Sequence, residues 1–139
     1  MSELPLPLIK VVGISASGKS TLVAILRQAG YNARPVSQEH SYIPDLWDQF
    51  EHPFVLISLN VDIDAQRRRR PDVTWEHSAH HQERARLANA ADHADLQVDT
   101  SQIPAEEVSK IVLTFLSRIK VRHQTEPLPP LSSTGSARR

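Results

Sequence analysis

The 139-residue chain contains no cysteine, which excludes a disulfide framework and any zinc or iron–sulfur site held by cysteine. This absence fits a reducing compartment, and we expect a cytoplasmic protein. No apolar run reaches the length of a membrane span, and the N-terminus lacks the basic-then-apolar pattern of a signal peptide. The sequence therefore predicts no membrane association.

An excess of either charge is also missing, because 16 basic residues balance 16 acidic ones. A neutral chain has no general attraction for a phosphate backbone, so nucleic acid is not an expected partner. Aromatic residues make up only 5% of the chain, which leaves few platforms for stacking bases. The length suits one domain with a substantial core.

The chain does contain one strong motif, because residues 13–20 read Gly-Ile-Ser-Ala-Ser-Gly-Lys-Ser and match the P-loop pattern G-x-x-x-x-G-K-[ST]. The glycines let backbone N–H groups point at an anion, Lys19 reaches the β- and γ-phosphates, and the Ser20 hydroxyl ligates Mg²⁺. The alternative is a glycine-rich turn without a ligand. The residues expected to bind nucleotide here are Gly13, Ser15, Ala16, Ser17, Gly18, Lys19, Ser20 and Thr21.

The flanking segments supply the context that this motif requires. Residues 8–12 are apolar and rich in β-branched side chains, as in a buried parallel strand. Leu22, Ile25, Leu26 and Ala29 follow at helical spacing, and Gly30 provides a helix stop. Strand, loop and helix thus occur in the order that a phosphate-binding loop needs.

Further strands and helices alternate along the chain. Pro35 must lie at an edge or near the end of its strand, Thr74 is a candidate helix cap, and Pro104 suits a first helical position. We expect strands over 31–37, 54–59 and 94–98, and helices over 64–70, 74–91 and 104–119.

This alternation predicts an α/β fold with a mainly parallel sheet of about four strands and helices on both faces. We expect the strand order 2-1-3-4, with the second strand beside the first. Residues 1–121 would form the domain. Residues 122–139 are polar and proline-rich, which predicts a disordered tail.

The guanine-binding Asn-Lys-x-Asp pattern of GTPases is absent. Residues 8–120 instead resemble the small P-loop kinases of the nucleoside-monophosphate kinase and shikimate kinase group. The resemblance rests on the P-loop, the apolar strand leading into Val61–Arg68, the helix with Glu83-Arg84-Ala85-Arg86, and Ala94–Thr100 before the last helix.

That resemblance implies a three-layer α/β/α P-loop NTPase fold, binding of ATP with Mg²⁺, and a small-molecule acceptor. It also implies that the loop with Thr100 and Ser101 flanks the adenine. The chain departs from the family in its short segment 38–53, where these kinases insert a substrate-binding region and another strand. A full nucleotide-substrate domain does not fit there.

A second carboxylate is expected near the loop, to hold Mg²⁺ or to orient the acceptor. Glu39 follows the second strand and is the favoured candidate, against a solvated loop carboxylate. Asp45 is a weaker substitute in the same segment. Asp62 and Asp64 follow the next strand, where helix capping is the more typical role.

Arginines are expected to neutralise the transferring group. Residues 67–70 are four successive arginines, and since neighbours on a helix point about 100° apart, only Arg67 and Arg70 share a face. Arg84 is the favoured second candidate, before Arg86. A solvated charged surface is the alternative for all of them.

Two other groups of residues need a test. His77 and His81 lie four residues apart near His80, but Glu76 precedes them and does not complete H-E-x-x-H, so a polar helix surface is favoured over a metal site. Tyr42, Trp47 and Phe50 are candidates for lining an acceptor pocket, although core packing is the default for aromatic side chains.

Together these features predict a small ATP-dependent kinase with Lys19, Glu39, Arg67, Arg70 and Arg84 as catalytic candidates, and with Ser20 and Glu39 at the metal. A non-catalytic nucleotide sensor is the first alternative, because a binding protein needs no acceptor pocket. A kinase for a nucleic-acid end is the second, and the zero net charge counts against it.

Overall fold

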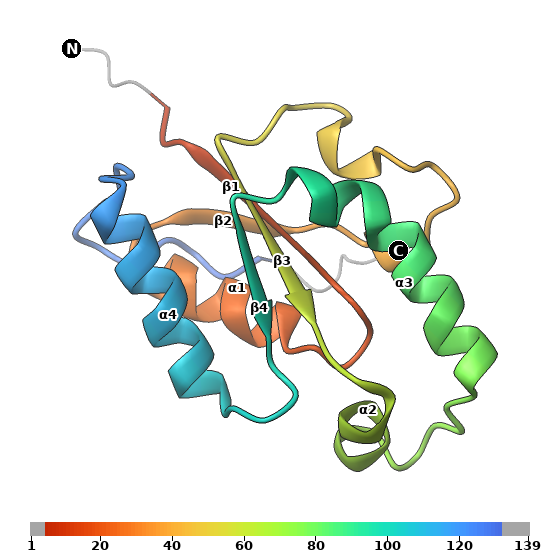
Figure 1. Ribbon diagram of the computed structural model, residues 1–139. Coiled ribbons are helices and arrows are strands. Elements are labelled where there is room, and N and C mark those ends of the chain that lie inside the picture. The colour runs from red at the N-terminus through yellow and green to blue at the C-terminus, as the bar shows by residue number, and fades with distance from the viewer. Residues whose placement is uncertain (1–4, 132–139) are drawn as a thin grey trace.

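Four strands form one sheet in which every neighbouring pair is parallel (Figure 1). The computed structural model describes residues 5–131, and the strands are β1 (Leu8–Gly13), β2 (Asn32–Pro35), β3 (Val55–Asn60) and β4 (Leu96–Asp99). Their order is β2-β1-β3-β4, which confirms the predicted α/β class, the four strands and the order 2-1-3-4. Pro35 is the last residue of the edge strand β2, where its missing N–H costs no sheet hydrogen bond.

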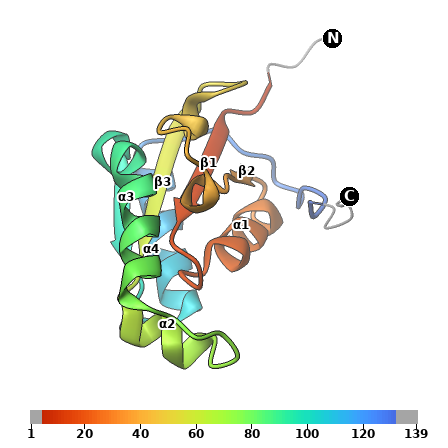
Figure 2. The same cartoon turned by 90° about the vertical axis from the view of Figure 1, so that its right-hand side faces the viewer.

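Helices cover both faces of the sheet. The helices are α1 (Lys19–Gln28), α2 (Ile63–Arg69), α3 (His77–His93) and α4 (Ala105–Arg118), and two short turns are η1 (Gln38–His40) and η2 (Leu46–Asp48). Figure 2 shows α1 and α3 on opposite sides of the strands, and α4 packs beside α1. Between residues 5 and 131, no helix is long and apolar enough to cross a membrane.

The alternation of side chains along β1 divides the core in two. Ile9 and Val11 face α1 and α4, while Val12 faces α3 together with the buried Trp47 of η2. Lys10 shares that second face, and its ammonium group donates to the carbonyls of Trp47 at 2.7 Å and Gln49 at 3.0 Å. Burial lowers the pKa of Lys10, with Asp48 and Glu51 acting in the opposite direction.

Two helix starts differ from the sequence-based prediction. The helix expected from Thr74 begins at His77, and Glu76 occupies its cap position without a side-chain hydrogen bond. Residues 74–76 are instead held outside the helix, where the Trp75 carbonyl accepts from Arg67 at 2.8 Å. Pro104 is the residue before α4 rather than its first helical residue.

Residues 122–131, the first part of the predicted tail, contact the domain. The Leu128 N–H donates to the carbonyl of Arg27 in the last turn of α1 at 2.8 Å, and the Gln124 N–H donates to the carbonyl of Gly30 just after the helix at 3.0 Å. The His123 ring stacks on the Tyr31 ring, with the two ring centroids 4.4 Å apart. Residues 132–139 of the predicted tail lie outside the described residues.

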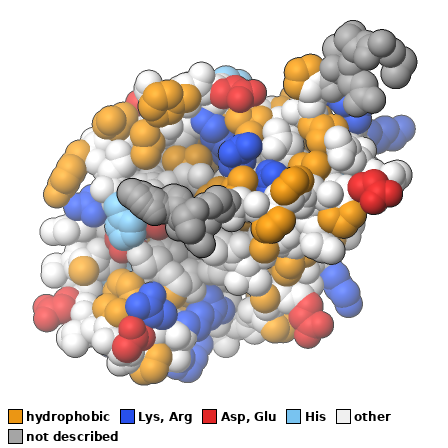
Figure 3. All heavy atoms as spheres, turned by 180° about the vertical axis from the view of Figure 1, so that it is seen from behind, with side chains coloured by type: hydrophobic (Ala, Val, Ile, Leu, Met, Phe, Trp, Pro, Cys, Tyr) orange, Lys and Arg blue, Asp and Glu red, His pale blue; other side chains and the backbone are white. Residues whose placement is uncertain are grey.

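Figure 3 shows the molecule from behind, with hydrophobic and charged side chains intermixed on that face.

Candidate functional site

The loop between β1 and α1 curls tightly back toward the sheet. Its Ser17 N–H donates to the Ile14 carbonyl at 3.0 Å. A side chain on Gly13 would overlap the Ser17 hydroxyl and crowd Leu59, so glycine is favoured at the end of β1. Gly18 has a φ of 96° and open space where a side chain would begin. Gly13 is thus favoured by the lack of space for a side chain, and Gly18 by its backbone conformation.

The start of α1 offers backbone donors to an anion. Gly18 is its cap residue, with no side-chain cap hydrogen bond, and its first turn holds no acidic residue. The first N–H groups of a helix have no partner within the helix and carry the positive end of its dipole. The buried Ser17 hydroxyl also lacks a hydrogen-bond partner among residues 5–131. These features fit the phosphate groups of a nucleotide.

The predicted lysine and carboxylate of the site lie in contact. The Lys19 ammonium group is 2.7 Å from both carboxylate oxygens of Glu39 and 3.3 Å from the Val36 carbonyl. Glu39 belongs to η1 and is buried. Because η1 follows β2, and β2 lies beside β1, this turn is next to the loop that leads into α1. The Glu39 carbonyl accepts from Arg86 at 3.2 Å, and the Arg86 guanidinium lies over the Tyr42 ring.

A second buried carboxylate reaches the loop from α3, and the sequence analysis did not find it. The two carboxylate oxygens of Glu83 accept from the Ser15 N–H at 2.9 Å and from the Ser15 hydroxyl at 2.8 Å. The buried Gln66 of α2 donates to the Ser15 carbonyl at 2.7 Å. Glu83 lies between Gln82 and Arg84 in a polar stretch, so no hydrophobic periodicity marked it as buried.

Of the four successive arginines, the structure brings Arg69 to the loop. Its guanidinium donates to the Ala16 carbonyl at 2.9 Å, to the Thr100 hydroxyl at 3.1 Å and to the Thr100 carbonyl. Arg69 lies three residues after the buried Gln66 and therefore shares its helix face. The predicted Arg67 instead donates to the Trp75 carbonyl, and the predicted Arg70 pairs with exposed Asp72 at 3.0 Å.

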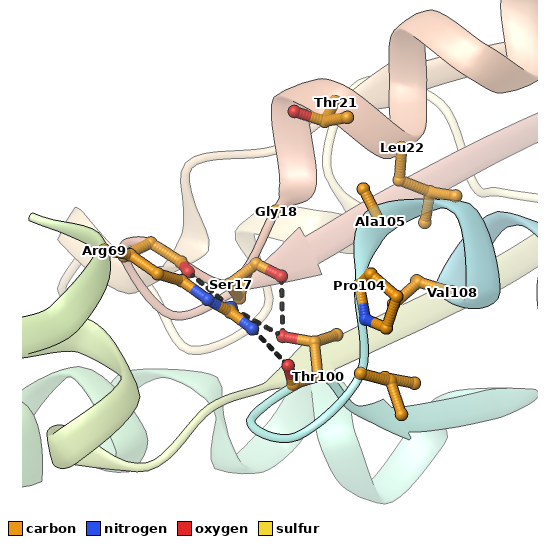
Figure 4. Close-up of a pocket in the computed structure, with 11 residues that line it drawn as sticks. Ser17, Gly18, Thr21, Leu22, Arg69, Thr100, Pro104, Ala105 and Val108 are labelled. Atoms are coloured by element: carbon orange, nitrogen blue, oxygen red, sulfur yellow. Dashed lines mark hydrogen bonds between the residues drawn. The ribbon is translucent and has the colours of Figure 1, made fainter.

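A cavity of about 230 Å³ opens beside this loop, between Ser17, Arg69, Thr100 and the first turn of α4 (Figure 4). The Thr100 hydroxyl donates to the Ser17 carbonyl at 2.8 Å, so the loop after β4 contacts the loop between β1 and α1. Apolar side chains that include Leu22 and Val108 line much of the remaining wall. The cavity has the position and lining expected for a nucleoside next to bound phosphates.

Ser101, predicted beside Thr100, has a structural role. Its hydroxyl accepts from the Asp62 N–H at 2.8 Å, and its own N–H donates to the Asp99 carboxylate at 2.9 Å. The hydrogen bond from Ser101 holds the pKa of Asp99 below its usual value. Ser101 therefore joins the ends of β3 and β4 and does not line the cavity.

The remaining candidates lie elsewhere. Arg84 lines a different depression, which also contains Ile14 and Asn60. Asp62 caps α2, because its carboxylate accepts from the Ala65 N–H at 2.8 Å. Asp45 and Asp64 are exposed. No cluster of three or more histidine or acidic residues within 5–131 could hold a metal. Tyr42 and Phe50 are exposed while Trp47 is in the core, so these aromatics line no common pocket.

A scan against protein-family models finds no family that matches the chain, and a search of the curated proteins finds no match. The chemistry of the site is therefore inferred from its own residues.

Proposed function

We propose that this chain is a P-loop protein that binds ATP with Mg²⁺ at residues 13–20 and transfers the γ-phosphate to a small-molecule acceptor. The observation that carries the proposal is the uncapped start of α1 after the loop that follows β1, with Lys19 as its first residue and Glu39 in contact with Lys19. The zero net charge supports a small acceptor over a nucleic acid. The lack of cysteine supports a cytoplasmic location.

The described residues supply the parts that phosphoryl transfer needs, which are positioning and charge neutralisation. Lys19 and the N–H groups at the start of α1 would hold the phosphates, and the exposed Ser20 hydroxyl would ligate Mg²⁺. Once Lys19 moves to phosphate, Glu39 is available to the metal or to an acceptor hydroxyl. Arg69 already lies at the loop and replaces Arg67 and Arg70 as the favoured arginine.

A non-catalytic nucleotide sensor is the second candidate. It is favoured by the short segment 38–53, where Tyr42 and Phe50 face solvent instead of enclosing an acceptor. Screening ATP consumption against a library of metabolites separates the two functions. Acceptor-dependent turnover supports the kinase, whereas nucleotide binding without turnover supports the sensor.

Replacing Lys19 tests the phosphate site. We expect Lys19→Ala to weaken binding of ATP with Mg²⁺ by roughly tenfold to a hundredfold, because a charge-assisted contact to phosphate is lost. Isothermal titration calorimetry measures the change, and Lys110→Ala on the exposed surface of α4 is the matched control. Unchanged affinity in Lys19→Ala, or no binding by the wild type, would contradict the proposal.

The buried carboxylate of Glu39 complicates this variant, because Lys19→Ala leaves it without its cation. The double variant Lys19→Ala, Glu39→Gln removes both charges. Urea unfolding of both variants without nucleotide shows whether lost affinity reflects lost folding.

A further inference from the structure

Every polar group of Ser15 is held by a side chain from a distant part of the chain. Glu83 accepts from its N–H at 2.9 Å and from its hydroxyl at 2.8 Å, and Gln66 donates to its carbonyl at 2.7 Å. Glu83 is 8% exposed and Gln66 is 0% exposed, so water does not compete for these bonds. Ser15 is a fixed point of the loop with no free backbone donor for phosphate.

The second half of the same loop is built differently. Gly18 precedes α1 without a side-chain cap, and apart from its chain neighbours no described residue lies within 4 Å of the place where its side chain would begin. The first N–H groups of α1 therefore have no acceptor from a capping side chain. The loop divides into an anchored part at Ser15 and an open part that begins at Gly18.

The anchor consists of side chains from two helices, Gln66 of α2 and His80 and Glu83 of α3. The His80 Nδ1 lies 2.6 Å from the Gln66 side-chain oxygen, and His80 precedes Glu83 by almost one turn of α3. Because the Gln66 nitrogen donates to the Ser15 carbonyl, its oxygen faces His80, and the His80 Nδ1 must donate. α2 and α3 thus hold Ser15 together.

We propose that Glu83 is a positioning residue that holds the first half of the phosphate-binding loop, so that the donors after Gly18 face the nucleotide. This inference rests on the proposed function. A carboxylate that competes with phosphate would be expected on the donors of α1, whereas both hydrogen bonds of Glu83 among residues 5–131 go to Ser15. The shape of the loop therefore depends on α3, although Glu83 is 68 residues from Ser15 in sequence.

Hydrogen exchange of the nucleotide-free protein tests the anchor directly. We expect Glu83→Ala to speed amide exchange in residues 14–18 by roughly tenfold or more, because the loop opens more often. Glu83→Gln should stay within about threefold of the wild type, since its oxygen can accept from the Ser15 N–H and its nitrogen can donate to the hydroxyl. The control is Glu76→Ala, an exposed glutamate beside the same helix. Unchanged exchange in Glu83→Ala overturns the proposal.

Nucleotide affinity tests the consequence of positioning. With Mg²⁺ and the β,γ-imido analogue of ATP, we expect Glu83→Ala to raise the dissociation constant by roughly tenfold. Glu83→Gln should retain most of the wild-type affinity. Unchanged or tighter binding in Glu83→Ala overturns the positioning role, and so does a glutamine variant that binds as weakly as the alanine variant. A merely structural loss would lower stability without this rescue.

The two proposals fail in different ways. If the wild type does not bind the analogue while Glu83→Ala still speeds exchange of the loop, nucleotide binding is overturned and the anchor remains. If Glu83→Ala does not fold, Ser15→Ala removes only the hydroxyl contact, and we expect exchange in residues 16–18 to rise by about threefold. No change in Ser15→Ala would overturn the anchor.

Discussion

At the scale of single residues, His80 lies where its charged form is disfavoured. Burial is the main cause that lowers its pKa from the ordinary value of 6.5, and the neighbouring Arg84 lowers it further. The carboxylates of Glu83 and Asp62 act in the opposite direction and do not overcome these effects. His80 is therefore a neutral donor to Gln66 in the folded protein near pH 7.

This pKa predicts a pH dependence of stability. Since the folded pKa of His80 is lowered, the unfolded chain binds more protons as the pH falls through 6.5, and the free energy of unfolding decreases there. The decrease ends once the pH is below the folded pKa. Urea unfolding at pH 7.5 and 5.5 measures the difference. His80→Asn keeps a donor nitrogen without a titrating ring, so it should reduce the difference in the free energy of unfolding between the two pH values. An equal difference in the wild type and the variant would contradict this account.

The residues of the site differ in how far the sequence reveals them. Glu39 could be placed near Lys19 because the carboxyl ends of neighbouring parallel strands meet, and the structure brings the two into contact. Arg69 was missed because spacing alone shows which arginines share a face but not which face is buried. Glu83 was missed because its burial depends on how α3 lies across the loop, which no local pattern encodes.

At the scale of elements, α2 begins at a defined cap. Asp62 accepts from the Ala65 N–H at 2.8 Å, and the Asp62 N–H is bound by the Ser101 hydroxyl. These contacts support the capping role that the sequence favoured over catalysis. The cap also fixes where Gln66 and Arg69 face the loop, because both lie on the first two turns of this short helix.

Removing the cap should cost stability. We expect Asp62→Ala to lower the free energy of unfolding by about 1 kcal/mol, as for other capping side chains. The exposed Asp64 has no cap hydrogen bond, so Asp64→Ala is the matched control and should cost only a few tenths of a kcal/mol. Urea unfolding measures both, and equal losses would argue against the cap.

Strong local patterns predicted the elements that form the sheet. The apolar residues of β3 and the motif between β1 and α1 define their elements without help from distant contacts. The start of α3 could not be predicted in the same way. Thr74 is a good cap, yet residues before His77 are held by Arg67 of α2, which is a tertiary contact.

At the scale of the whole molecule, the chain after α4 returns to the far end of α1. Residues 122–131 lack a hydrophobic pattern of their own, and composition alone therefore predicted disorder. They pack because α1 and β2 supply partners for them, including the Arg27 side chain that donates to the Pro129 carbonyl at 2.8 Å. A polar segment can be ordered by a surface that its own sequence does not describe.

Removing this segment should weaken the fold. We expect truncation after Val121 to lower the free energy of unfolding by roughly 2 kcal/mol or more, because buried Arg27 loses a partner and Tyr31 loses the stacked His123. Truncation after Leu131 keeps these contacts and is the control. Thermal or urea unfolding measures the change, and equal midpoints for both shortened chains would contradict it.

The strand order also determines when the sheet can assemble during synthesis. β1 pairs with β2 on one side and with β3 on the other, and β4 is added to β3. Within residues 5–131 no two strands form a hairpin, so each pairing must close a long stretch of chain. As the chain leaves the ribosome, β1 remains open on one side until Asn60 has emerged, and β3 remains an edge until Asp99 has followed. A nascent chain that pauses between these points would expose an apolar strand that the finished protein buries.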